Sequence, residues 1–384
     1  MDTNLITNQF LKSVAIFNYT HQDCQMAQQA TTNAFMQTIR LLHIFFCTLG
    51  TISTSLFIYV LLSSTSKHLH PNLRVSLASL AFAACLACLQ LNFMAFHQIW
   101  THFRAETPCD LLFDARKCAA FRFPVVLSIY ATLCAIIVLA IERSYATWQY
   151  RTYEAEKSRF LGRVLVVIQW IVCFGLATIS VILRSDHGFV HYCTAYVSHP
   201  RTAVFSLCFM SSLELLTLIY FILLLQSNQR RQVNEFVNKA MHSLSERYQL
   251  QENVRVMRIL IPSITLHAIL GLLGLGSMLI FAIFYRNSSN STWIIDFAPF
   301  SEVVLLILPI YAVIFPIVAI FMSKQLRIST RRTLPFFFAA QEDEKSETLL
   351  EPPPAHTVIA SRPSRQMEKE SDTHFDLLNE MWKK

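Results

Sequence analysis

Seven long apolar runs divide the chain, with polar segments between them. A bilayer core requires about 20 predominantly apolar residues in a helix. Core helices of a soluble protein would show polar residues recurring on one face, and that pattern is mostly absent here. The runs cover residues 41–62, 75–96, 123–141, 164–183, 202–225, 259–284 and 297–322. We therefore predict an all-α membrane protein with a seven-transmembrane helix bundle.

Composition supports this class, and the distribution of charge adds an orientation. Hydrophobic residues make up 53% of the chain and charged residues 15%, whereas soluble domains carry about 25% charged residues. The loops on one side of the bundle hold 17 basic and six acidic residues. The segments on the other side hold nine basic and seven acidic residues. Basic residues favour the cytoplasmic side. We expect an extracellular N-terminus and a cytoplasmic C-terminus in the cell membrane.

The segments that flank the runs differ in character. Residues 1–40 are polar and mixed, and we expect them to form an extracellular segment. Residues 323–333 are basic and amphipathic, which predicts a short helix on the inner leaflet. Residues 334–384 are rich in charge and proline, so they are expected to form a mostly disordered cytoplasmic tail.

Glycosylation sequons and cysteines agree with this orientation. The sequons begin at Asn18, Asn287 and Asn290, all in segments predicted to lie outside the cell. Of the ten cysteines, six lie in the runs and none lies in a predicted cytoplasmic loop or tail. The other four are Cys24, Cys109, Cys118 and Cys193. An even number of thiols in the oxidising compartment suggests disulfides.

A Glu-Arg pair follows the third run directly. It belongs to the first of three motifs in the chain. Residues 140–154 read AIERSYATWQYRTYE, residues 244–262 read LSERYQLQENVRVMRILIP, and residues 108–122 read PCDLLFDARKCAAFR. These motifs resemble the nematode serpentine chemoreceptors of the Sra superfamily, with serpentine receptor class AB as the best match. More broadly, the chain resembles the rhodopsin-like seven-transmembrane G-protein-coupled receptors.

The resemblance implies a chemosensory receptor in the membrane of a sensory-neuron cilium. Such a receptor binds an external small-molecule or peptide ligand and activates a heterotrimeric G protein. The resemblance also implies a disulfide between Cys118, at the top of the third span, and Cys193 in the second outer loop. Cys24 and Cys109 form a second candidate pair, with two free thiols as the alternative.

Acidic residues inside the apolar runs are candidates for the ligand site. An acid within a membrane helix is costly and usually faces the bundle interior with a partner. We expect Glu214 to face the interior, where it hydrogen-bonds a neighbour such as His267 or contacts the ligand. Glu302, nearer the outer surface, is a further candidate. The alternative for Glu214 is a protonated side chain used only in helix packing.

The Glu142-Arg143 pair is the candidate switch for G-protein coupling. We expect carboxylates to hold Arg143 at rest, first Glu142 and then Glu252 or Glu246 from the sixth helix, because arginine offers a fork that two oxygens can accept. One alternative is that Arg143 only anchors its helix at the lipid headgroups. Another is that Glu252 pairs along its own helix with Arg255.

Other classes of membrane protein fit the sequence less well. A metalloenzyme needs several His or carboxylate ligands at one depth, and the runs contain few. We predict that the chain is not an enzyme and uses no metal, cofactor or nucleic acid. A ligand-gated channel or a transporter of the sensory membrane is the alternative function. It would favour inverted repeats or broken helices in matching halves.

Overall fold

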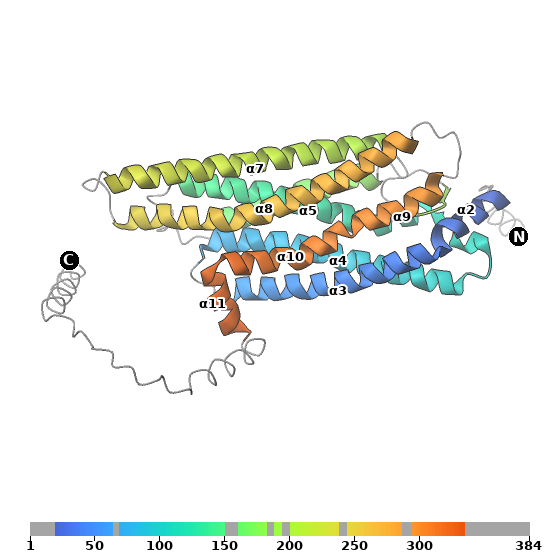
Figure 1. Ribbon diagram of the computed structural model, residues 1–384. Coiled ribbons are helices and arrows are strands. Elements are labelled where there is room, and N and C mark those ends of the chain that lie inside the picture. The colour runs from blue at the N-terminus through green and yellow to red at the C-terminus, as the bar shows by residue number, and fades with distance from the viewer. Residues whose placement is uncertain are drawn as a thin grey trace, which may run out of the picture. The chain divides into compact units, whose positions relative to one another are not determined.

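The computed structural model describes residues 20–63, 69–149, 160–182, 188–193, 200–237, 244–285 and 293–334. Within these residues the chain is almost entirely helical (Figure 1). The described residues contain seven helical spans that are long and apolar enough to cross a membrane. The predicted fold class, a seven-transmembrane helix bundle, is therefore confirmed.

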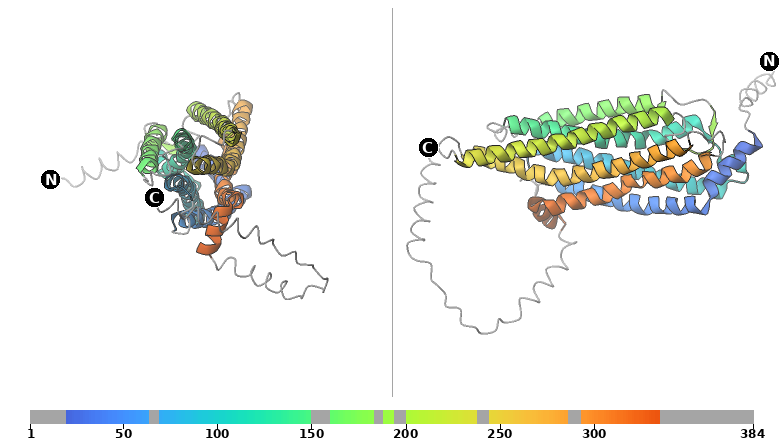
Figure 2. Two further views of the ribbon diagram at one scale, coloured as in Figure 1. Left: turned by 90° about the vertical axis from the view of Figure 1, so that its left-hand side faces the viewer. Right: turned by 45° about the horizontal axis from the view of Figure 1, so that its top comes forward.

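The spanning helices run side by side, and most extend beyond the apolar runs (Figures 1 and 2). They are α3 (Ala34–Leu62), α4 (Pro71–Arg104), α5 (Ala115–Trp148), α6 (Phe160–Ala177), α7 (Pro200–Val237), α8 (Leu244–Tyr285), and α9 (Trp293–Leu305) with α10 (Ile307–Met322). A π-helical turn, η3 (Thr178–Ile182), continues α6. The helices exceed the runs because their polar ends still form backbone hydrogen bonds along the helix axis.

The seventh span consists of two helices, whereas the apolar run 297–322 predicted one. The break lies at Leu306, whose backbone N–H donates to Val303 O over 3.2 Å in a tighter turn. Pro309 has no N–H to donate to the carbonyl of Leu305 in the preceding turn, so the regular ladder is interrupted at this point.

One end of the bundle carries two disulfides, and we call it the disulfide end. There α2 (His21–Thr32), capped by the Thr20 hydroxyl, lies at the start of α3. A bond between Cys24 and Cys109 ties α2 to the 3₁₀ turn η2 (Pro108–Leu111). A bond between Cys118 and Cys193 ties α5 to the segment 188–193. These are the pairs that the sequence suggested.

A two-stranded sheet also lies at the disulfide end. Strand β1 (Phe113–Asp114) pairs antiparallel with β2 (Phe189–Val190), with Phe113 opposite Val190. The segment that carries Tyr192 and Cys193 is thereby fixed over the bundle by a sheet on one side and a disulfide on the other.

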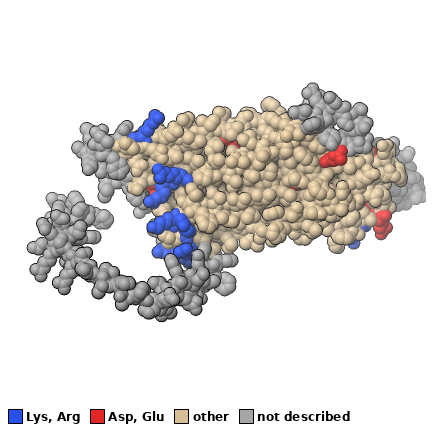
Figure 3. All heavy atoms as spheres, in the orientation of Figure 1, with Lys and Arg blue, Asp and Glu red and all other residues tan. Residues whose placement is uncertain are grey.

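The opposite end carries Arg143, and we call it the Arg143 end. Helix α11 (Lys324–Thr333) begins here directly after α10, capped by the Ser323 hydroxyl. Its Leu326 is buried, whereas Arg331 and Arg332 are exposed, which makes the helix amphipathic. On the face shown in Figure 3, Lys and Arg gather at this end, and the middle of the bundle shows almost no charge.

The centre of the bundle is filled by large apolar side chains from most of the spanning helices. They include Phe57, Leu61, Leu77, Leu80, Leu139, Phe221, Leu260 and Phe315. Other large side chains are more than half exposed on the outer faces, among them Phe45, Phe93, Phe174, Leu216 and Ile269. Lipid tails are as apolar as these faces, so the hydrophobic effect does not drive the helices together in a membrane. Close packing and polar contacts between helices hold the bundle together instead.

Some predicted features lie outside the described residues. They are the sequons at Asn18, Asn287 and Asn290 and nearly all of the predicted tail, residues 335–384. Their glycosylation and disorder stay predictions.

Candidate functional site

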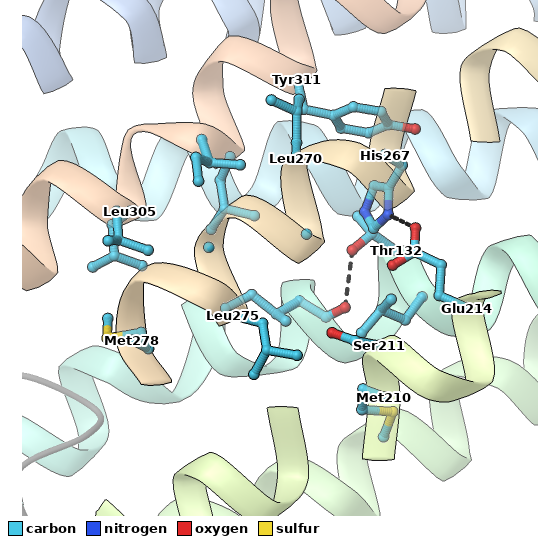
Figure 4. Close-up of a pocket in the computed structure, with 17 residues that line it drawn as sticks. Thr132, Met210, Ser211, Glu214, His267, Leu270, Leu275, Met278, Leu305 and Tyr311 are labelled. Atoms are coloured by element: carbon cyan, nitrogen blue, oxygen red, sulfur yellow. Dashed lines mark hydrogen bonds and ion pairs between the residues drawn. The ribbon is translucent and has the colours of Figure 1, made fainter. Parts of the chain in front are cut away.

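A cavity of about 110 Å³ opens inside the bundle among α5, α7, α8, α9 and α10 (Figure 4). Its walls are mainly aliphatic, with leucines, isoleucines and two methionines from all five helices. Its polar lining consists of Thr132, Ser211, Glu214, His267 and Tyr311. A mostly apolar pocket with a few polar groups is the usual form of a small-molecule site.

Glu214 and His267 form the polar centre of this cavity. The Glu214 carboxylate on α7 hydrogen-bonds Nδ1 of His267 on α8, and both side chains are buried. The ring of Tyr311 stands edge-on to the His267 ring, with centroids 4.7 Å apart. Figure 4 shows the carboxylate and the imidazole pointing toward each other. The structure thus brings together the two residues that the sequence proposed as partners.

Gly271 makes room for this pair. It follows His267 by one helical turn, so both lie on the same face of α8. A Cβ atom at Gly271 would lie 3.2 Å from Oε2 of Glu214, which is tighter than an ordinary contact. A side chain at this position would therefore require the Glu214 carboxylate to move by a few tenths of an ångström.

Glu302, the third predicted ligand residue, lies outside the lining of this cavity. Its Oε1 accepts hydrogen bonds from Nη2 of Arg122 over 2.6 Å and from the Tyr192 hydroxyl over 2.7 Å. Nε2 of His43 lies 3.0 Å from its backbone oxygen and 3.4 Å from Oε2. The side chain of Glu302 therefore faces α3, α5 and the segment 188–193, which carry these three partners.

Glu302 belongs to a buried polar cluster at the disulfide end, which we call the Glu302 cluster. It comprises Arg40, His43, Gln98, Arg122, Tyr192 and Glu302. Arg122 also donates two hydrogen bonds to the carbonyl of Cys193. Burial and the Glu302 carboxylate raise the pKa of Tyr192 well above its usual range, so its phenol stays neutral. The cluster fixes the disulfide-bonded loop to the bundle.

The apolar runs gave Arg122 no role, although its position relative to Cys118 carries a signal. Arg122 follows Cys118 by four residues, so both lie on one face of α5. An arginine one turn below a cysteine that binds the loop could have been predicted to reach the same loop.

The Glu142-Arg143 pair is buried at the Arg143 end of α5. Arg143 donates two hydrogen bonds to the two carboxylate oxygens of Glu142. Its Nη1 lies 3.4 Å from Oδ1 of Asn253 on α8, and Nδ2 of Asn253 donates to the carbonyl of Ala146 over 3.2 Å. An asparagine on α8 therefore bridges the arginine and the backbone of α5.

Of the two carboxylates expected to reach Arg143 from α8, Glu252 needs a correction and Glu246 stays a prediction. Glu252 accepts a hydrogen bond from Arg255 over 3.2 Å along its own helix, which is the alternative considered above. Among the described residues of α8, Asn253, the next residue, reaches Arg143. Successive residues of a helix point about 100° apart, so the buried Asn253 faces α5 while Glu252 sits at the wetter edge. The side chain of Glu246 lies outside the described residues.

The comparison with known proteins decides the family. Residues 21–344 match the sequence model of the family described as serpentine type 7TM GPCR receptor class ab chemoreceptor. The chain belongs to this family. A Caenorhabditis elegans protein, serpentine receptor class alpha/beta-14, is 70% identical over 373 residues, which cover 97% of this chain and 96% of that protein.

Two more distant relatives come from the same organism. Serpentine receptor class beta-17 is 24% identical over 279 residues, 71% of this chain and 75% of its own length. Serpentine receptor class alpha-39 is 24% identical over 212 residues, 55% and 56% of the two chains. The chain is thus a multi-pass membrane protein of a chemoreceptor family, and that family consists of receptors and not of enzymes.

In this class ab serpentine receptor, the Arg143 end of α5 is also bonded to α7. The buried Asn228 donates through Nδ2 to the Thr147 hydroxyl over 3.0 Å. The hydroxyls of Ser144 and Tyr220 lie 2.6 Å apart. Sequence reasoning missed these contacts because uncharged polar residues near helix ends are common in membrane proteins. Hydrogen bonds around Arg143 consequently connect α5 to both α7 and α8.

Proposed function

We propose that this receptor detects an external chemical ligand in the Glu214–His267 cavity and activates a heterotrimeric G protein at the Arg143 end. The observation that carries the proposal is that one helix, α8, contributes to both places. His267 on α8 lines the cavity, and Asn253 on α8 contacts Arg143. The two residues are 14 positions apart, or roughly 21 Å along a helix.

The proposed orientation places the disulfide end outside the cell and the Arg143 end in the cytoplasm. Disulfides form in oxidising compartments, which supports the first assignment. The Lys and Arg residues gathered at the Arg143 end support the second. We place the receptor in the cell membrane, and its chemoreceptor family favours the cilium of a sensory neuron.

The proposed mechanism is a shift between two arrangements of the bundle. A ligand that binds one arrangement more tightly shifts the population toward it, and no chemistry on the ligand is needed. A ligand group that competes for Glu214 or His267 alters the contact between α7 and α8. Displacement of α8 then separates Asn253 from Arg143 and frees the arginine for the G protein.

The form of the cavity supports a proposal for the class of ligand. Its size and aliphatic walls suit a small, mostly apolar molecule with one hydrogen-bonding group for the Glu214–His267 pair. A screen of volatile and water-soluble compounds in cells that express the receptor, with calcium as the readout, identifies such a molecule.

The Glu214→Gln variant then tests the pocket. We expect it to shift the dose–response curve while surface expression is kept. Thr217→Val is the control, because the Thr217 hydroxyl bonds its own helix through Leu213 O. An unchanged response of Glu214→Gln would contradict the ligand role. A ligand-evoked current in cells without G protein would favour the channel alternative.

A further inference from the structure

Arg40 is a buried cation whose hydrogen bonds are incomplete. It lies on α3 at the disulfide end and is only 1% exposed. Its Nε donates to Oε1 of Gln98 over 3.0 Å, and this partner is neutral. Its two terminal nitrogens, Nη1 and Nη2, are buried without a hydrogen bond of good geometry to a described residue, although the neutral Tyr192 hydroxyl lies close enough to interact with the guanidinium.

The charges of the Glu302 cluster do not balance. Glu302 is the carboxylate that acts on Arg40 among the described residues, but its Oε1 already accepts from Arg122 and Tyr192. Its Oε2 faces His43 at 3.4 Å. Tyr192 keeps its proton, as described above, and contributes no negative charge. Two guanidinium groups therefore share one carboxylate.

An arginine cannot remove this imbalance by losing its proton, because its pKa lies above the physiological range. A buried charge without a counter-ion is strongly destabilising, and buried donors are normally paired. A negative group that accepts from Nη1 and Nη2 would supply both the missing charge and the missing acceptors.

We propose that Arg40 binds a small monovalent anion, either chloride or the carboxylate of a short organic acid. Both sources offer one negative charge that can accept from the two terminal nitrogens. Arg40, Gln98 and Tyr192 are all buried, so the proposed site is enclosed by the protein. It lies apart from the Glu214–His267 cavity, so the inference goes beyond the proposed function and does not depend on it.

The test is the thermal stability of the purified full-length receptor in nanodiscs at constant ionic strength. Sodium gluconate, whose anion is bulkier than chloride or acetate, is replaced stepwise by sodium chloride in one arm and by sodium acetate in the other. We expect a saturable rise in melting temperature on the order of 3 °C. A rise with chloride alone identifies a resident ion, and a rise with acetate alone identifies a carboxylate site.

Three variants assign the effect to Arg40. Arg40→Gln removes the cation and should abolish the anion dependence. Gln98→Glu places a carboxylate on the residue that already contacts Arg40, so it should also abolish the dependence and raise the melting temperature in gluconate. Arg74→Gln is the matched control and should keep the dependence, because Arg74 is a buried arginine that donates to the carbonyls of Leu61 and Ser63.

The proposal fails if neither chloride nor acetate changes the melting temperature of the wild-type receptor beyond the effect of gluconate. It also fails if Gln98→Glu retains the full anion dependence. The second result remains decisive even if Arg40→Gln does not fold.

Discussion

Helical phase decides which residues of α8 face the rest of the bundle. The buried Asn253 contacts Arg143, whereas its neighbour Glu252 pairs with Arg255. Charge alone could not separate two adjacent residues, since a rotation of about 100° decides which of them is buried.

The contact of Asn253 predicts a change in basal signalling. Asn253→Ala removes the bridge between α8 and α5, so we expect higher ligand-free signalling, by roughly fivefold for a loss of about 1 kcal/mol. The measurement is basal nucleotide exchange on the G protein at matched surface expression. Glu252→Gln is the control and should change it little. The role given to Asn253 is wrong if Glu252→Gln raises basal nucleotide exchange and Asn253→Ala leaves it unchanged.

The close approach at Gly271 predicts a change in ligand response. Gly271→Ala places a methyl group against the Glu214 carboxylate, so we expect about a fivefold loss of potency for an activating compound. Gly276→Ala on the same helix meets no atom within 4 Å and should leave potency unchanged. Equal potency of both variants would show that the position of the carboxylate does not matter.

Two disulfides join segments at the disulfide end that are distant in the sequence. Non-reducing peptide mapping should recover Cys118 linked to Cys193 and Cys24 linked to Cys109. Replacement of both Cys118 and Cys193 by serine should cost about 2–5 kcal/mol and strongly reduce surface expression. Recovery of Cys118 and Cys193 as free thiols would contradict the first pairing.

The spanning helices could be predicted from the sequence more readily than the break within the seventh. Lipid offers no hydrogen bonds, so each crossing segment must satisfy its own backbone and appears as a long apolar run. Leu306 and Pro309 lie inside such a run, and hydropathy does not register a lost backbone bond. Proline is tolerated in membrane helices, so its presence alone does not place a kink.

At the scale of the whole molecule, the sequence predicted the bundle and part of its interior. Glu214 and His267 were recognisable because polar groups stand out in apolar runs. The Glu302 cluster was not predicted as a unit, because Arg40, Gln98 and Arg122 lie just outside the apolar runs. Only the folded chain shows that α3, α4, α5, α9 and the loop bury them together.

We propose that α8 transmits ligand binding in the cavity to Arg143, which then engages the G protein. Arg143 and Glu142 are both buried and form an ion pair, so replacement of one alone changes the net charge of this buried site. The double variant Glu142→Gln/Arg143→Gln removes both charges together. Glu142→Gln alone keeps the arginine and serves as the comparison.

The most direct measurement is ligand-evoked nucleotide exchange on the G protein by this double variant, at surface expression matched to the wild type. The account predicts that exchange is abolished while binding of the activating compound is retained. It also predicts that Glu142→Gln alone still signals, with a raised basal level. Normal ligand-evoked exchange by the double variant would contradict the account.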